Sequence, residues 1–187
     1  DAHPNQLSHT MQSPQPPAKA LVFNAATART TLFQALLETV KTYGADRPAQ
    51  EAAGAVLRYF DTAARHHHDD EEQDLFPALL ESMAGSDAVC LRELTAALCH
   101  DHRQLEQRWA VLRQRLLQVA AGGACTLADA DIPGFVALYA QHIAREEAEL
   151  LPMAARLLSD AELDRIGLAM RTRRAPPAPT PSALPCT

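Results

Sequence analysis

The stretch HHDDEEQDLFP, residues 67–77, is the most informative part of the sequence. A second stretch, HIAREEAELLP at residues 142–152, repeats its spacing. In each copy a histidine is followed four residues later by a glutamate and ten residues later by a proline. Residues at positions i and i+4 share one face of an α-helix, so each copy presents an imidazole and a carboxylate to the same point. Two such helices packed together would offer four ligands to a metal ion.

Outside this repeat, the composition indicates a helical domain. The chain has 187 residues, of which 47% are hydrophobic but only 5% aromatic, and it contains only 7 glycines. This length fits one domain with tails, and the abundance of Ala and Leu favours helices over sheet. We predict a bundle over residues 20–170, between a disordered N-terminal tail (1–19) and a Pro-rich C-terminal tail (171–187).

Start and stop signals divide the bundle into four long helices. We predict them over residues 18–43, over 46–84, from the N-cap Ser86 to the Gly122–Gly123 stop, and over 131–158. A short fifth helix follows, since Ser159 and Glu162 have capping-box spacing. Short connections place consecutive helices antiparallel, so the predicted fold is all-α, an up-down-up-down four-helix bundle with a short fifth C-terminal helix. Pro77 and Pro152 should bend the second and fourth helices at equivalent depth.

Charge and cysteine usage exclude several classes of protein. The formal charge of -6 disfavours nucleic acid as a partner, and no apolar run is long enough to span a bilayer. The four cysteines have no CxxC spacing, which is unlike a disulfide framework or a zinc ribbon. Residues 1–20 contain no apolar core of a signal peptide. We therefore expect reduced cysteines and a cytoplasmic location.

Helical spacing directs five polar side chains toward the interior of the bundle: His67, Glu71, His102, His142 and Glu146. Buried charges are unfavourable unless they are paired or bound to a metal, so several imidazoles and carboxylates at one depth predict a cation site. Imidazole combined with carboxylate suits iron, manganese or zinc.

The triple histidine at residues 66–68 requires a choice. Consecutive residues lie about 100° apart around a helix axis, so all three side chains cannot face inward. The repeat aligns His142 with His67 and therefore selects His67, whereas His68 is intermediate. Tyr59 and Tyr139 could lie near the site as hydrogen-bond donors, with ordinary core packing as the alternative.

The acidic residues between the predicted ligands have a simpler interpretation. Asp69, Asp70 and Asp74 follow the triple histidine and are expected to form a solvated face.

With His102 on the intervening helix, the two stretches resemble the hemerythrin-like family, also called the HHE cation-binding domain, over about residues 18–160. The resemblance implies a four-helix bundle with a non-haem di-iron centre that carries or stores O2 or senses oxygen, nitric oxide or iron. By motif, the ligands would be His67, Glu71, His102, His142 and Glu146, with the glutamates bridging. Glu147 is an alternative for the last carboxylate.

The chain departs from the family pattern at two positions. The family expects a histidine on helix one, but no histidine lies between His9 and His66, and only Asn24 and Thr27 offer polar groups at the expected place. Position 98 is a leucine where a second histidine would precede His102. The remaining set could support one well-held metal, or two with a weakly held second position.

These observations favour a non-enzymatic binding protein without catalytic residues. It would hold iron, as a di-iron or a mononuclear centre, and sense a small diatomic ligand such as O2 or NO, or redox state. One alternative is a di-iron oxidase or a peroxide-consuming enzyme, in which open coordination positions activate O2. Another is a degenerate, metal-free helical interaction protein. The sequence names no protein partner.

Overall fold

A computed structural model of the chain describes residues 46–82, 87–123 and 131–175. The predicted first helix (18–43) and the predicted N-terminal tail lie outside these residues. The last helix continues to Arg174, into the segment predicted as the C-terminal tail, of which residues 176–187 also lie outside. Within the described ranges every regular element is helical, which confirms the all-α prediction. No helix in these ranges is long and apolar enough to cross a membrane.

The predicted second helix is a continuous column of five segments: α3 (Arg47–Arg58), η1 (Tyr59–Ala64), α4 (Arg65–Asp70), η2 (Glu71–Leu75) and α5 (Phe76–Ser82). Asp46 begins it as the N-cap, because its carboxylate accepts a hydrogen bond of 3.1 Å from the backbone N–H of Ala49. The segments η1 and η2 are π-helical.

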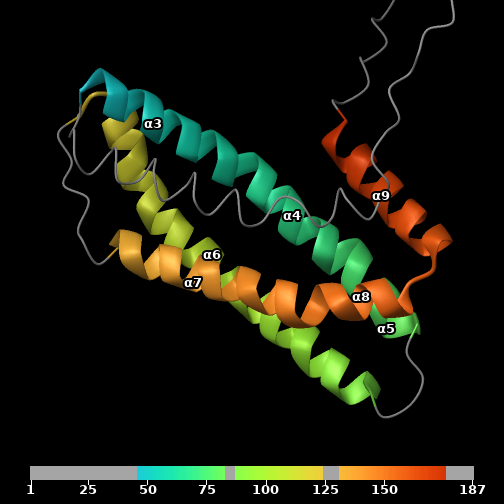
Figure 1. The fold of residues 1–187 in the computed structure, drawn as a ribbon. Coiled ribbons are helices and arrows are strands. Elements are labelled where there is room, and N and C mark those ends of the chain that lie inside the picture. Colours follow the sequence, from blue (N-terminus) through green and yellow to red (C-terminus); the bar gives the residue numbers. More distant parts are fainter. Residues whose placement is uncertain (1–45, 83–86, 124–130, 176–187) are drawn as a thin grey trace, which may run out of the picture.

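The predicted third and fourth helices also form. The third is α6 (Asp87–Ala120), and its end is followed by Gly122 with a φ of 77°. The fourth comprises α7 (Asp131–Arg145), η3 (Glu146–Leu150) and α8 (Leu151–Leu157). Figure 1 shows these columns side by side with alternating direction, as in an up-and-down bundle. The predicted capping box of Ser159 and Glu162 begins α9 (Asp160–Arg174).

Each repeated stretch contains a π-helical turn that begins at its first glutamate. The N–H of Phe76 bonds to the carbonyl of Glu71, and the N–H of Leu151 bonds to the carbonyl of Glu146, so each bond reaches back five residues. A proline follows directly in both copies. Its ring clashes with the carbonyl four residues earlier in a regular α-helix, and widening to a π turn relieves this clash. The predicted disturbance at equivalent depth thus takes the form of two π turns.

The core contains two apolar clusters. A polar layer lies between these clusters on each of the three described helical columns. The first apolar cluster has its members in residues 49–64, 105–119 and 132–143, and the second in residues 75–79, 91–98 and 150–166. The polar layer comprises the buried side chains His68, Glu71, His102, His142 and Glu146. The fold therefore places a polar layer between two apolar clusters of the described residues.

Helix α9 packs against the column that carries the first repeated stretch, next to the polar layer. Two of the three arginines in its last turn, Arg173 and Arg174, reach Asp70, and Arg173 also donates to Asp74 at 2.6 Å. The side chain of Asp70 is 0% exposed, so the prediction that it belongs to a solvated face is wrong. A buried carboxylate requires compensating charge, and α9 supplies it.

Candidate metal centre

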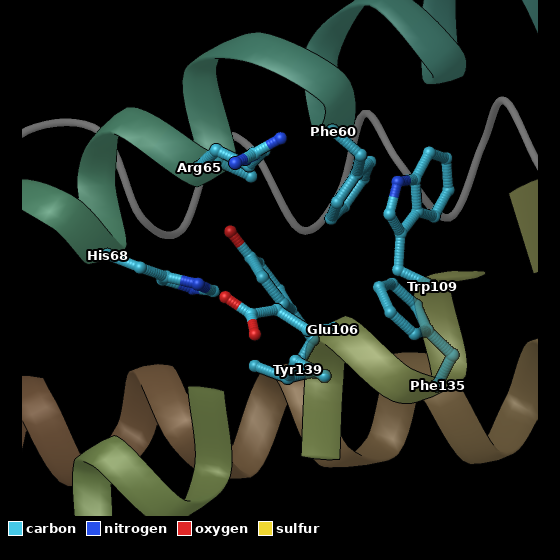
Figure 2. Close-up of a pocket in the computed structure, with 9 residues that line it drawn as sticks. Phe60, Arg65, His68, Glu106, Trp109, Phe135 and Tyr139 are labelled. Atoms are coloured by element: carbon cyan, nitrogen blue, oxygen red, sulfur yellow. The ribbon is translucent and has the colours of Figure 1, made fainter. Parts of the chain in front are cut away.

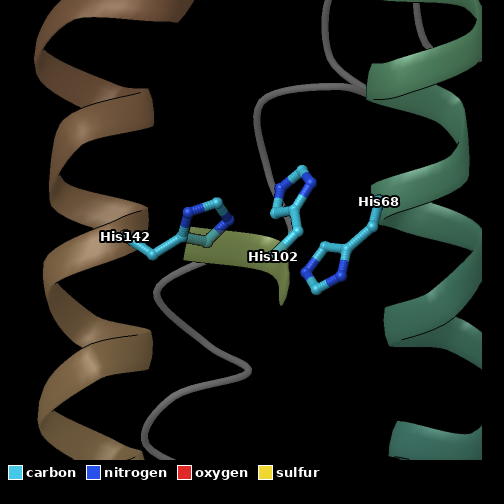
Figure 3. A group of neighbouring side chains, drawn as sticks. All are labelled: His68, His102 and His142. Carbon is cyan, nitrogen blue, oxygen red and sulfur yellow. The ribbon is translucent and has the colours of Figure 1, made fainter. Parts of the chain in front are cut away.

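Three helical columns bring the polar layer together. Figure 3 shows the imidazoles of His68, His102 and His142 turned toward one another from α4, α6 and α7. Glu71 and Glu146 open the π turns η2 and η3, so the repeated proline and its π turn set the backbone position from which each carboxylate projects. All five side chains are buried.

The donor atoms of this layer form two overlapping groups. Glu71, His102, His142 and Glu146 each offer one ligand atom within 4.8 Å of the others, and His68 forms a second such group with His102 and His142. The two groups share two histidines. Four of the five residues predicted as ligands therefore meet at one point.

Several of these atoms are buried without a hydrogen-bond partner among the described residues: His68 Nε2, Glu71 Oε2, His102 Nε2, both ring nitrogens of His142, and Glu146 Oε1. Nε2 of His142 lies 2.5 Å from Oε1 of Glu146, and Nε2 of His102 lies 3.2 Å from Oε2 of Glu71, yet neither pair has hydrogen-bond geometry. Unsatisfied buried donors and acceptors are costly. A cation bound between them would satisfy the lone pairs on these nitrogen and oxygen atoms.

His67, which the repeat selected, lies at the edge of the group. Its side chain is 24% exposed, and its Nε2 is 3.8 Å from Glu71 Oε1 and 3.7 Å from Glu146 Oε1. This atom is close to both carboxylates. However, His67 belongs neither to the group of Glu71, His102, His142 and Glu146 nor to the group of His68, His102 and His142. The role of His67 as a ligand stays a prediction.

Sequence reasoning left His68 undecided, and the structure places it inside the polar layer. The sequence held one signal for this position, because His68 and Glu71 are three residues apart and such residues also share a helix face. The aligned position in the other copy is Ile143, which is buried in the first apolar cluster.

A second set of polar groups holds the ring of His102. Nδ1 of His102 pairs with Oε1 of Glu72 at 2.7 Å, and Arg103 pairs with the other oxygen of this carboxylate. Fixing Nδ1 in this way directs Nε2 of His102 toward Glu71. Sequence reasoning missed Glu72, although it is the second glutamate of the repeated stretch. Of the two predicted tyrosine donors, Tyr139 is buried in the first apolar cluster, and the hydroxyl of Tyr59 has no partner among the described residues.

At His68 and Glu146 the electrostatics favour the protonation states that bind a metal, whereas at His102 burial lowers the pKa but pairing with Glu71 and Glu72 outweighs burial and raises it. Burial, together with the neighbouring imidazoles of His102 and His67, lowers the pKa of His68 to about 2. Burial alone would raise the pKa of Glu146, but the imidazoles of His142 and His67 outweigh burial and lower it well below its usual range. A neutral imidazole and an ionised carboxylate both carry free lone pairs for a cation.

A small apolar pocket reaches the polar layer. It has a volume of about 30 Å³ and is lined mainly by aromatic side chains, with His68 at one side. Figure 2 shows the rings of Phe60, Trp109 and Phe135 gathered opposite His68. A site of this volume accommodates about one water-sized molecule.

Comparison with known proteins identifies the family. The family model of the hemerythrin HHE cation binding domain matches residues 28–154, which include every predicted ligand. No curated protein matches the chain. The match covers more than half of the sequence and agrees with the helical bundle and its buried His/Glu cluster, so the chain belongs to the hemerythrin HHE cation-binding family.

Proposed function

We propose that this protein binds non-haem iron in the polar layer of its bundle and uses it to sense a small diatomic ligand or redox state. The observation that carries the proposal is the convergence, from three helical columns, of buried imidazole and carboxylate atoms that have no hydrogen-bond partner in the described part of the chain. The family assignment supports a cation as their partner. Mixed nitrogen and oxygen donors suit iron, and manganese or zinc would compete for the same atoms.

The residues that would hold the metal are those of the four-residue group, with His67 beside them. Glu71 and Glu146 lie on different columns and each approaches His67, which supports them as the candidates for bridging carboxylates. Bound iron would supply a redox-active centre with an open position for a diatomic molecule. Glu72 would hold the ring of His102, and the lowered pKa of Glu146 favours its ionised form.

The apolar pocket supports a small and uncharged ligand. A volume of about 30 Å³ and a lining of aromatic rings favour a molecule such as O2 or NO over a polar metabolite. We therefore propose a binding protein over an enzyme. The cytoplasmic location stays a prediction from the sequence.

Elemental analysis and visible spectroscopy test the proposal. We expect the purified protein to retain one or two irons per chain and to change its visible spectrum between air and reducing conditions. Glu71→Ala and Glu146→Ala should each weaken metal binding by at least about 10- to 100-fold, taking the effect of outer-shell residues as a floor. Glu149→Ala is the matched control, because Glu149 is exposed on the same π turn.

Three outcomes would contradict parts of this proposal. Unchanged iron retention in both glutamate variants would remove the assignment of the site. A wild-type protein that takes up no metal would indicate the metal-free interaction protein. Sustained consumption of O2 or peroxide by the iron-loaded protein with a reductant would indicate the enzyme.

A further inference from the structure

The family pattern leaves a gap in this chain that one buried side chain is placed to fill. A histidine is expected on helix one, yet the sequence has none between His9 and His66. The chain instead has a second histidine directly after His67, where the other repeated stretch has Ile143. Both side chains are 7% exposed, so an imidazole replaces an apolar group at an equivalent buried position.

The position of His68 is unusual for a histidine that only packs. Its ring stacks on His102 with centroids 4.0 Å apart and lies 5.7 Å from the ring of His142. Its Nε2 is buried and has no hydrogen-bond partner among the described residues. A packing histidine normally satisfies its ring nitrogens with hydrogen bonds, and leaving one unsatisfied costs free energy that an apolar residue would avoid.

His68 also shares its neighbours with the carboxylate group. Its ligand atom lies within 4.8 Å of those of His102 and His142, and these two histidines also belong to the group with Glu71 and Glu146. An ion between His102 and His142 is therefore within reach of His68 as well. His68 also lines the apolar pocket, so this residue borders both the donor groups and the space proposed for a diatomic ligand.

We propose that His68 is a further metal ligand, which supplies through Nε2 the imidazole that helix one lacks. The ion that His68 would bind is a first-row divalent metal ion, with Fe²⁺ as the first candidate. With His67, the donor set becomes four histidines and two carboxylates, which is sufficient for two ions held by shared carboxylates. This inference rests on the proposed function, because it completes the same site.

The test compares His68→Ile, which copies the residue of the other repeated stretch, with wild type. Anaerobic titration with Fe²⁺, and separately with Zn²⁺, should show a Kd at least about 10-fold higher in the variant, or one ion fewer per chain. His66→Ile is the matched control, since His66 belongs to the same triplet and to neither donor group; its Kd should equal that of wild type. The metal-free His68→Ile protein should unfold at the same or a higher temperature than metal-free wild type, whereas losing a structural histidine would lower that temperature.

A second measurement on wild-type protein does not depend on the variant folding. Long-range ¹H–¹⁵N spectra of the histidine rings should show the Nε2 signal of His68 moving to the metal-bound range on addition of Zn²⁺. An unshifted signal, or equal Kd and stoichiometry in His68→Ile and wild type, would overturn the role of His68 while leaving the metal site intact. A wild-type protein that binds neither ion would overturn the proposed function and this inference together.

Discussion

His67 and His66 differ in how close they come to the carboxylates of the site. Nε2 of His67 lies within 3.8 Å of an oxygen of Glu71 and within 3.7 Å of one of Glu146. His66 belongs to neither donor group, as expected for a neighbour rotated by about 100°. A small shift of the His67 side chain would bring its nitrogen to an ion held by the two glutamates.

We therefore expect His67→Ala to lower iron affinity by at least about 10-fold, with His66→Ala unchanged. Competition with a chelator of known affinity measures both variants under the same conditions. Equal losses in the two variants would mean that the register of the triple histidine is wrong. If His67→Ala leaves the iron affinity unchanged and His68→Ile lowers it, then His68 is the metal ligand in place of His67.

At the scale of the elements, most helix boundaries could be predicted because each depends on a local signal. The Asp46 cap, the left-handed Gly122 and the capping box of Ser159 all act within one turn of the chain. The spacing of histidine and glutamate in the two stretches likewise predicted three of the five residues of the polar layer, and the helical spacing of the third helix predicted His102.

What could not be predicted depends on departures from the regular helix and on distant partners. Periodicity assumes 3.6 residues per turn, and the π turns η1 and η2 on either side of α4 break this period, so the facing of His67 and His68 could not be read from spacing. The burial of Asp70 depends on Arg173 and Arg174, which lie about a hundred positions later in the chain. Pro77 signals a disturbance near η2 but not its π form, and the distant partners of Asp70 leave no local signal in the sequence.

The contact between α9 and Asp70 gives a prediction about stability. Replacing Arg173 and Arg174 together by Met would leave a fully buried carboxylate unpaired, so we expect the free energy of unfolding to fall by about 3 kcal/mol. Chemical denaturation of the metal-free protein measures this change. Adding Asp70→Asn to the double variant should recover part of the loss, because an amide carries no charge.

Arg171→Met serves as the control for this pair, since Arg171 is an exposed arginine in the same last turn of α9. Its effect should stay within about 0.5 kcal/mol, as for most surface substitutions. A double variant as stable as this control would show that water or another group compensates the charge of Asp70.

For the whole molecule, helix α9 both stabilises the fold and packs beside the candidate metal site. The family match ends at residue 154, whereas α9 spans Asp160–Arg174 and docks beside the residue that precedes Glu71. The chain thus adds, beyond the matched segment, a helix that packs onto one of its ligand-bearing columns. Helix α9 also contributes Leu163 and Ile166 to the second apolar cluster, so its docking is both ionic and apolar.

The polar layer has a consequence for how the protein opens. It separates two apolar clusters, and in the metal-free protein its unsatisfied atoms contribute little to holding them together. Backbone amides beside each cluster should then exchange with deuterium as two separate blocks, each with its own opening free energy. Metal binding should join the blocks into one cooperative unit with uniformly slow exchange. Identical exchange of both blocks without metal would show that the helices alone transmit cooperativity along the bundle.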